Sequence, residues 1–214
     1  MALVVGIDTG GTFTDLIAFD LQTGRLVQGK ALTSYANIMD GIRECVRRAG
    51  VSLAQAGSIT HGTTHVINAY LQRQGAKTAL VTTRGFRDSL EIGRANRPTG
   101  FQMRLRRLPP LVPRHLRFEA EERMDASGQV LQPLELESLE TVARAAESEG
   151  VEALAVSFLN AYRNAAHEQQ AAQWLKNRLP GIFVTSAVEL SREWFEFERT
   201  STAVTNAFMG TALQ

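Results

Sequence analysis

The sequence predicts an α/β protein built around a mixed β-sheet. Near its start, two apolar runs rich in β-branched residues flank a glycine-rich turn, a pattern that predicts two paired strands. Farther along, strands of buried type alternate with segments of helical periodicity, which is typical of parallel strands joined by crossover helices. Hydrophobic residues make up 44% of the 214 residues, a proportion that is ordinary for a globular core.

The first three strands are expected to form an antiparallel group. They cover Leu3–Ile7, Asp15–Asp20 and Leu26–Leu32, and a Thr23–Gly24 turn joins the last two. Within this stretch, Gly24 to Lys30 matches the spacing of a phosphate-binding P-loop. Ala follows the lysine, so the hydroxyl that binds Mg²⁺ in a P-loop is missing, and this segment predicts a strand instead.

Helices and strands alternate in the remainder of the chain. After the third strand we expect a helix from about Tyr35 to Ala49 stopped by Gly50, a strand Ser58–His61, a helix Val66–Gln74, a strand Lys77–Thr82 and a short helix Phe86–Ile92. Later elements are a helix from Leu136 closed by Gly150, a strand Ala153–Leu159, a helix from the cap Asn164 to about Leu179, a strand Ile182–Ser186 and a helix from about Trp194. The order is β-β-β-α-β-α-β-α, then a ribbon, then α-β-α-β-α.

Residues 93–133 interrupt this alternation as a Pro/Arg-rich insertion. Gly93 to Arg114 has no clear period, and Leu116–Met124 with Val130–Leu131 predicts a small β-ribbon. Seven arginines cluster in the Pro-rich stretch and just after it: Arg94, Arg97, Arg104, Arg106, Arg107, Arg114 and Arg117. Three glutamates follow at once and balance this charge, which favours a solvated loop or a docking surface for a polypeptide over a nucleic-acid site. Arg94 follows a short helix and is the arginine expected to reach into a cleft.

Composition excludes several classes of protein. The net charge of +1 gives no general attraction to nucleic acid or to a membrane surface. A single cysteine, Cys45, excludes an intrachain disulfide, and no apolar run approaches the length of a membrane span. The first strand begins at about Ala2, which leaves no room for a signal peptide, so we expect a cytoplasmic protein.

The turn between the first two strands has the chemistry of a phosphate site. Asp8 ends one strand, Gly10 and Gly11 follow, and Asp15 begins the next strand. Glycines reach positive φ and let backbone N–H groups approach an anion. Asp8 is the carboxylate expected to hold hydrated Mg²⁺, and Asp15 is expected to order water. Three hydroxyls add possible donors: Thr9, Thr12 and Thr14. An ordinary polar turn is the alternative.

A second candidate segment, His61-Gly62-Thr63-Thr64-His65, lies where a strand meets a helix. The free N–H groups of a helix start attract anions, so Thr63 and Thr64 are candidates to touch a transferred phosphoryl group, and His61 is a candidate acid or base. The alternatives are a helix cap at Thr63 or Thr64, and a metal pair of His61 with His65.

A third segment, Glu196 to Thr202, starts the last helix. Its charged residues and hydroxyls suit either a helix that lines a nucleotide cleft or the ordinary chemistry of a helix start, and the sequence favours neither.

Three antiparallel strands followed by parallel crossovers, with a phosphate hairpin between the first two, are the architecture of a lobe of the actin-like, ribonuclease H-like ATPases. Five segments together resemble the hydantoinase A/5-oxoprolinase family. They follow one another in the family's order and span nearly the whole chain: Gly6–Asp15, His61–Thr64, Ala79–Asp88, Leu90–Arg94 and Glu198–Thr202.

The resemblance implies an actin-like ATPase fold that uses ATP and Mg²⁺. Members of the family open cyclic amides such as hydantoins or 5-oxoproline, and related large subunits belong to acetone and acetophenone carboxylases. Phosphorylation of a substrate oxygen would activate the substrate. The metal ligand would then be Asp8. The expected nucleotide-binding residues are Asp8, Thr9, Gly10, Gly11, Thr12, Thr14 and Arg94, and the expected catalytic residues are Asp8, Asp15, His61, Thr63 and Thr64.

The chain also departs from the family pattern. His65–Ile67 resembles the carboxylase-like branch, and no second acid-Gly-Gly-Thr motif follows Asp15. Family members are several times longer, so residues 1–214 are expected to form a truncated N-terminal ATPase lobe, inactive without a second lobe or partner subunit. A cyclic-amide hydrolase is favoured. A ketone carboxylase and a non-catalytic docking module with a vestigial nucleotide site are the alternatives.

Overall fold

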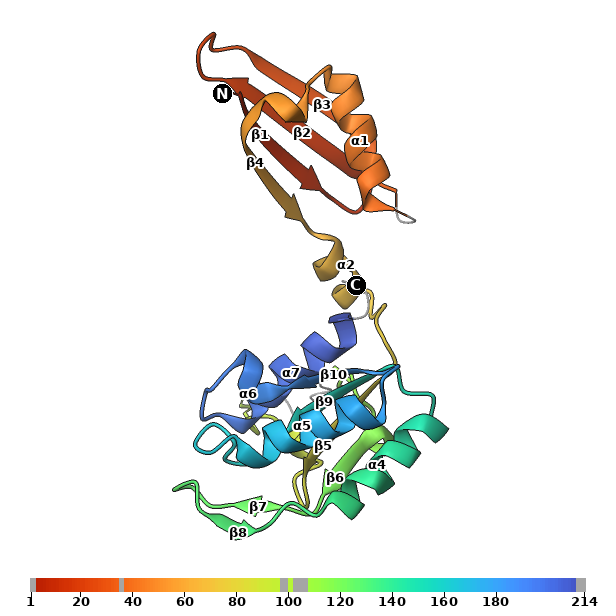
Figure 1. Cartoon of the computed structure of the whole chain (residues 1–214), viewed down its shortest axis with the longest axis vertical. Helices are drawn as coiled ribbons and strands as arrows, with labels where there is room; N and C mark the ends of the chain where they lie inside the picture. Colours follow the sequence, from red (N-terminus) through yellow and green to blue (C-terminus); the bar gives the residue numbers. More distant parts are fainter. Residues whose placement is uncertain (1–2, 35–36, 97–99, 102–107, 211–214) are drawn as a thin grey trace. The chain divides into compact units, whose positions relative to one another are not determined.

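The computed structural model describes residues 3–34, 37–96, 100–101 and 108–210 (Figure 1). The chain divides into two compact units, Met1–Gln74 and Gly75–Gln214. Each unit has its own four-stranded sheet and its own hydrophobic core. The predicted α/β class with a mixed sheet is confirmed, but the main strands belong to two separate four-stranded sheets.

The sheet of the first unit is mixed. Its strands are β1 (Leu3–Thr9), β2 (Phe13–Asp20), β3 (Leu26–Leu32) and β4 (Ala56–Thr63), in the order β3-β2-β1-β4. The first three strands are antiparallel, and β4 runs parallel to β1. Residues 24–30 match the spacing of a P-loop, and residues 26–30 of this segment form part of strand β3, as predicted.

Helix α1 (Ile38–Ala49) covers one face of this sheet (Figure 1). It begins later than predicted because the side chain of Asn37 accepts a hydrogen bond from the Met39 N–H and caps the helix. Gly50 ends it in the left-handed conformation with φ 64°, as expected for a helix stop. The predicted first residues of this helix, 35 and 36, lie outside the described residues.

Alternation along the strands decides which side chains are buried. On the covered face, apolar side chains of the strands pack with Ile42 and Cys45 of α1: Val5, Ile7, Leu16, Ala18 and Ala31. On the other face Val4, Ile17 and Phe19 are exposed. Because successive side chains of a strand point to opposite faces, the first unit has one covered and one open sheet face.

Two short helical segments flank strand β4 in the last part of the first unit. The 3-10 helix η1 (Leu53–Gln55) precedes β4, and α2 (His65–Leu71) follows it. The predicted helix was to continue to Gln74, but Arg73 adopts a positive φ of 55°, which is incompatible with a continued right-handed helix.

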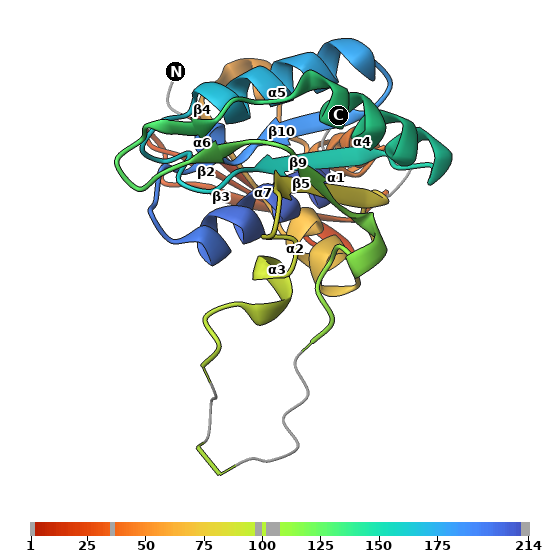
Figure 2. The same cartoon turned by 90° about the horizontal axis from the view of Figure 1, so that it is seen from below.

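The second unit contains a parallel sheet with helices on both faces. Its strands, in the order β10-β9-β5-β6, are β5 (Thr78–Thr83), β6 (Arg117–Ala120), β9 (Ala153–Ser157) and β10 (Phe183–Ser186). Figure 2 shows helices α4 (Leu136–Ser148) and α5 (Ala166–Arg178) on one face and α7 (Glu196–Gly210) on the other. The short helices are α3 (Ser89–Ile92), η2 (Arg114–Leu116) and α6 (Ala187–Leu190). Among the helices described, none has both the length and the apolar character needed to cross a membrane.

The predicted ribbon was too long at its start. Residues 117–120 form β6, which pairs in parallel with β5 as an edge strand of the main sheet. The antiparallel ribbon contains only β7 (Arg123–Met124) and β8 (Val130–Gln132). Four arginines of the insertion lie outside the described residues: Arg97, Arg104, Arg106 and Arg107.

Candidate functional site

The turn between β1 and β2 is tight and is tied to the segment after β3. The Gly10 N–H donates to the Phe13 carbonyl oxygen at 2.9 Å. Thr33 donates its hydroxyl to the Gly10 carbonyl oxygen at 2.9 Å and its N–H to the Thr12 carbonyl oxygen at 3.0 Å. Gly10 does not use the positive φ that a glycine can reach. Gly10 is instead required by close approach, because a Cβ there would lie 3.2 Å from the Phe13 oxygen.

Three charged side chains form a row across the open face, next to this turn. Asp8 of β1 is the register partner of Asp15 of β2, which is the partner of Lys30 of β3. The Lys30 Nζ lies 2.7 Å from the Asp15 Oδ1 and 4.6 Å from the centroid of the Phe13 ring. On the other side of Asp8 stands Gly62 of β4, whose missing Cβ would lie 3.5 Å from the Asp8 Oδ1. The Asp8 carboxylate therefore has open space beside it.

Two of the expected phosphate donors lie on the other face. Thr9 and Thr14 are fully buried on the side of the sheet that α1 covers. A hydrogen bond of 3.0 Å joins the Thr9 Oγ1 to the His61 Nε2, and one of 3.2 Å joins the Thr14 hydroxyl to that of Thr33. The Cys45 thiol donates to the Thr14 carbonyl oxygen at 3.3 Å. The hydroxyls of Thr9 and Thr14 thus make hydrogen bonds next to the turn, on the covered face of the sheet.

The end of β4 is joined to the end of β1. The Thr63 hydroxyl and the Thr64 N–H both donate to the Thr9 carbonyl oxygen, each at 3.1 Å. Thr64 occupies the N-cap position of α2, but its hydroxyl makes no capping hydrogen bond. The side chain of His65 lies outside the described residues, so the alternative of a metal pair with His61 lies outside them too.

The structure brings some of the predicted residues together and separates others. Asp8, Asp15 and the turn share one edge of the open face, whereas His61 belongs to the register row of Ile7 on the opposite face. Arg94 belongs to the second unit, where it is paired with Glu198 and its guanidinium stacks 4.3 Å from the Phe195 ring centroid.

The Glu198–Thr202 segment has a clear packing role. Arg199 is completely buried and donates to the Phe158 carbonyl oxygen at 2.6 Å and to the Glu196 Oε2 at 2.8 Å. The Thr200 hydroxyl lies 2.8 Å from that of Ser157. These contacts fix α7 against β9.

Sequence reasoning missed a buried carboxylate, Glu168 of α5. It accepts hydrogen bonds of 2.8 Å from the N–H groups of Phe158 and Val188 and from the Ser186 hydroxyl. Burial raises the pKa of Glu168 above its ordinary value. Its neighbours are far apart in sequence, so no local motif marks it; a helical position that faces the core was the only signal.

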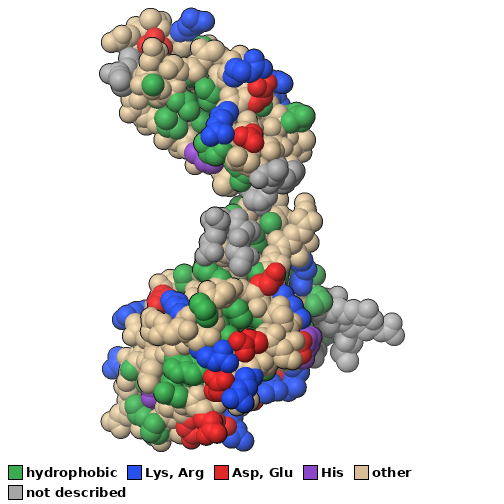
Figure 3. Space-filling view, turned by 45° about the vertical axis from the view of Figure 1, so that its right-hand side comes forward, with side chains coloured by type: hydrophobic (Ala, Val, Ile, Leu, Met, Phe, Trp, Pro, Cys, Tyr) green, Lys and Arg blue, Asp and Glu red, His purple; other side chains and the backbone are tan. Residues whose placement is uncertain are grey.

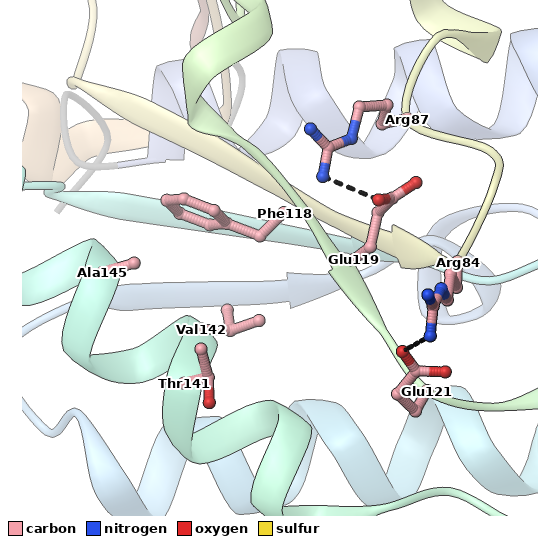
Figure 4. Close-up of a pocket in the computed structure, with 8 residues that line it drawn as sticks. All are labelled: Arg84, Arg87, Phe118, Glu119, Glu121, Thr141, Val142 and Ala145. Atoms are coloured by element: carbon pink, nitrogen blue, oxygen red, sulfur yellow. Dashed lines mark hydrogen bonds and ion pairs between the residues drawn. The ribbon is translucent and has the colours of Figure 1, made fainter.

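A hollow of about 370 Å³ in the second unit is the alternative binding site (Figure 4). Arg87 donates to Glu119 at 2.6 Å, and Arg84 is paired with Glu121. These four charges neutralise one another, so the hollow offers a ligand little uncompensated charge. Charged side chains are also interspersed with hydrophobic ones elsewhere on the surface of the second unit (Figure 3). The row on the first unit is the better candidate, because it borders the glycine turn and its exposed Asp8 carboxylate can hold a cation that attracts a phosphate ligand.

A magnesium ion fits this row by donor chemistry. Asp8 is an exposed carboxylate with open space beside it, created by Gly62. Within the described residues, no three His, Cys, Asp or Glu side chains gather as a cage. Mg²⁺ does not need one, because it keeps several waters and is commonly held by one or two carboxylates together with substrate phosphates.

Comparison with known proteins identifies the family. The model of the hydantoinase/oxoprolinase N-terminal region matches residues 4–179. The chain belongs to this family. The resemblance to this family that the sequence motifs indicated is thereby confirmed, and four of the five segments lie within the matched residues.

Relatives within the hydantoinase/oxoprolinase family include amide hydrolases and carboxylases. The chain is 34% identical over 215 residues to the caprolactamase subunit alpha of Pseudomonas jessenii, covering 96% of this chain and 31% of that protein. The structure of the ATP-dependent caprolactamase from that organism superposes with a TM-score of 0.84 at 32% identity, over 98% of this chain and 32% of that one. A nucleotide-free acetone carboxylase superposes with a TM-score of 0.86 at 28% identity, over 97% of this chain and 32% of that one. The chain thus spans about a third of the length of these relatives.

Proposed function

We propose that this chain is the N-terminal, ATP-handling part of an ATP-dependent enzyme that opens cyclic amides. The observation that carries the proposal is the Asp8 carboxylate, exposed at the end of β1 between a tethered glycine turn and Gly62. Membership of the hydantoinase/oxoprolinase family supports it, as does the similarity to an ATP-dependent caprolactamase.

Some residues of the first unit would contact Mg²⁺ and the phosphates, and others would hold these residues in position. Asp8 would hold Mg²⁺, and the turn Gly10–Thr12 would lie against the phosphates. The buried hydroxyls of Thr9 and Thr14 would keep the turn in place, and Thr63 would tie β4 to β1. His61 is bonded to Thr9 on the opposite face, which favours a supporting role over the acid–base role first expected.

When bound, ATP would supply a phosphoryl group that converts an unreactive amide oxygen into a good leaving group. The task of these residues is then to position the phosphates and to balance their charge, which is most of what a protein contributes to phosphoryl transfer. The three antiparallel strands with a parallel fourth suit the first unit to an actin-like ATPase lobe. We propose that residues 1–214 together belong to one such lobe, with residues 93–133 as its insertion.

The substrate class has a second candidate. The similarity to acetone carboxylase, with a TM-score of 0.86 over 97% of this chain, favours a ketone carboxylase as the alternative. In either case we propose that the other side of the nucleotide site comes from a second lobe or a partner subunit, because the chain covers 31% of the length of caprolactamase subunit alpha.

Calorimetric titration of the purified chain with ATP tests the proposal. We expect weak binding that needs Mg²⁺ and disappears with EDTA, and no ATP-dependent opening of caprolactam, hydantoin or 5-oxoproline, because one side of the site is missing. Absence of Mg²⁺-dependent nucleotide binding would reject the ATP-handling role and favour a docking module with a vestigial site. Rapid ring opening by the chain alone would reject the partial site.

A further inference from the structure

Lys30 of β3 lies in the same row as the two carboxylates of the candidate site. Its ammonium group is held from two sides, by the Asp15 carboxylate at 2.7 Å and by the Phe13 ring at 4.6 Å. Its side chain nevertheless remains 56% exposed on the open face. An exposed ion pair of this kind contributes little to stability, so stability does not account for the arrangement.

Open space adjoins this ion pair. A hollow of about 520 Å³ is lined by residues 15–17 of β2 and 28–30 of β3, and it leaves room beside Lys30 on the side of the row away from the turn. The tethered turn, which follows Asp8 and ends at Phe13, borders the same row. A group bound at the turn would therefore lie close to a fixed positive charge.

The charges of the row and of a bound Mg²⁺ indicate a role for Lys30. Two carboxylates and one ammonium leave the row with one net negative charge, and one Mg²⁺ changes this to one net positive charge. Without Lys30, two neighbouring carboxylates would attract the cation strongly but would repel a polyphosphate. With Lys30 bonded to Asp15, Asp8 is the carboxylate left for the metal.

We propose that Lys30 is the cation that faces the nucleotide phosphates, and that Asp15 and Phe13 are positioning residues that hold its ammonium group. This rests on the proposed function, and it changes the expected role of Asp15 from ordering water to orienting a lysine. Lysine is a common phosphate-binding residue because its ammonium group is a compact charge with three donors.

The test titrates the Lys30→Met variant with Mg·ATP and, separately, with Mn²⁺. We expect the substitution to lower the affinity for Mg·ATP and to raise the affinity for Mn²⁺. Loss of a charge-assisted contact should weaken Mg·ATP binding by about tenfold or more. Release of Asp15 should tighten the binding of Mn²⁺ alone, measured by calorimetry or by the paramagnetic resonance of free Mn²⁺. Lys30→Arg should restore part of the Mg·ATP affinity. Asp15→Asn should weaken Mg·ATP binding less than Lys30→Met, because the positive charge remains.

Lys176→Met is the matched control. Lys176 forms an exposed ion pair with Glu189 at 3.6 Å in the second unit, so its loss should change neither titration. Circular dichroism checks that each variant is folded.

The outcomes are separable. Weaker Mg·ATP binding with tighter Mn²⁺ binding supports the proposal. Unchanged Mg·ATP binding overturns it, and so does a loss of both affinities, which would indicate a merely structural lysine. If the unaltered chain binds no Mg·ATP, the proposed function fails. The Mn²⁺ titration then still tests whether the ion pair with Lys30 keeps Asp15 from binding the cation. Equal Mn²⁺ affinities of Lys30→Met and the unaltered chain would overturn this role of Lys30.

Discussion

Neighbouring residues at the end of β1 have opposite surroundings. Asp8 faces solvent, while Thr9 is fully buried and bonded to His61. The cause is the two-residue period of a strand, which sends successive side chains to opposite faces. A shift of one residue in register would bury the carboxylate and expose the hydroxyl. The register of the β1–β2 pairing therefore determines that Asp8 lies on the open face.

Asp8→Asn should abolish Mg²⁺-dependent nucleotide binding while leaving stability unchanged. The amide keeps the shape of the side chain but removes the charge that a hard cation requires. Titration calorimetry and a thermal melt measure the two effects. Asp40→Asn on α1 is the control, because Asp40 is an exposed carboxylate that contacts Arg43 and the Asn37 side chain and takes no part in the row. Equal affinities of Asp8→Asn and the unaltered chain would remove Asp8 from the site.

At the scale of elements, β3 and α1 pack closely at Gly29. A Cβ there would lie 2.7 Å from the Cys45 carbonyl oxygen and 2.9 Å from the Ala49 Cβ. The backbone oxygen cannot move aside without shifting the helix. Since α1 covers the face that holds Thr9 and Thr14, this contact supports the candidate site from beneath.

Gly29→Ala should destabilise the first unit by about 1–3 kcal/mol, the usual cost of an overpacked core. Gly6→Ala is the control, because its Cβ would meet only the Ile17 oxygen, at 4.0 Å. Urea unfolding with hydrogen exchange of the β1–β3 segment measures both. A Gly29→Ala protein as stable as Gly6→Ala would contradict the close packing of α1 on β3.

In the second unit, an ion pair links α4 with α5. Arg178 donates to Glu140 at 2.9 and 3.1 Å, and Arg144 donates to it at 2.9 Å. These hydrogen bonds, that of Arg178 first, lower the pKa of Glu140 from 4.5 to about 2. A carboxyl group whose pKa falls on folding stabilises the protein above its unfolded pKa, and this contribution is lost as the pH falls towards the folded pKa.

Glu140→Gln should therefore lower the melting temperature modestly at pH 7, because the ion pair is partly exposed and screened by solvent. The difference from the unaltered chain should shrink as the pH falls from about 5 to about 2. Thermal melts across this range measure it, with Glu137→Gln on the same helix as control. A difference that stays constant down to pH 2 would contradict the shifted pKa.

At the scale of the whole molecule, the chain consists of two compact units that meet in sequence at Gln74 and Gly75. Each has its own sheet and core, and the four strands of the first sheet all precede the junction. Residues 71–75 are exposed, and Arg73 is held at a positive φ. Such segments are preferred sites of proteolytic cleavage.

Brief treatment with an arginine-specific protease should cut after Arg73 and release a first unit that keeps its sheet. Mass spectrometry identifies the fragment, and circular dichroism with hydrogen exchange tests its structure. Arg73→Gln should remove this cut and leave others unchanged. A released fragment that loses its exchange protection would contradict the independence of the first core.

Much of the fold was predictable because its signals are local. The strand periodicity of β1 and β2, the glycine stop after α1 and the strand character of residues 26–32 all follow from the nearest neighbours in sequence. Errors arose where distant partners decide. Residues 117–120 had the pattern of a ribbon strand, but their pairing with β5 made them an edge of the main sheet. The turn at Gly10 is closed through Phe13 and Thr33, which the local sequence did not indicate.

The sequence by itself determined the α/β class and the family, because the motifs that carry both are contiguous runs of residues. It also marked Asp8 and the glycine turn as the candidate site. Only the tertiary structure decided that the main strands form two four-stranded sheets, that Thr9 and Thr14 are buried, and that Lys30 lies beside Asp15. The physical reason is the same in each case: strand pairing and helix packing join residues far apart in the chain, and no local pattern specifies which partners they meet.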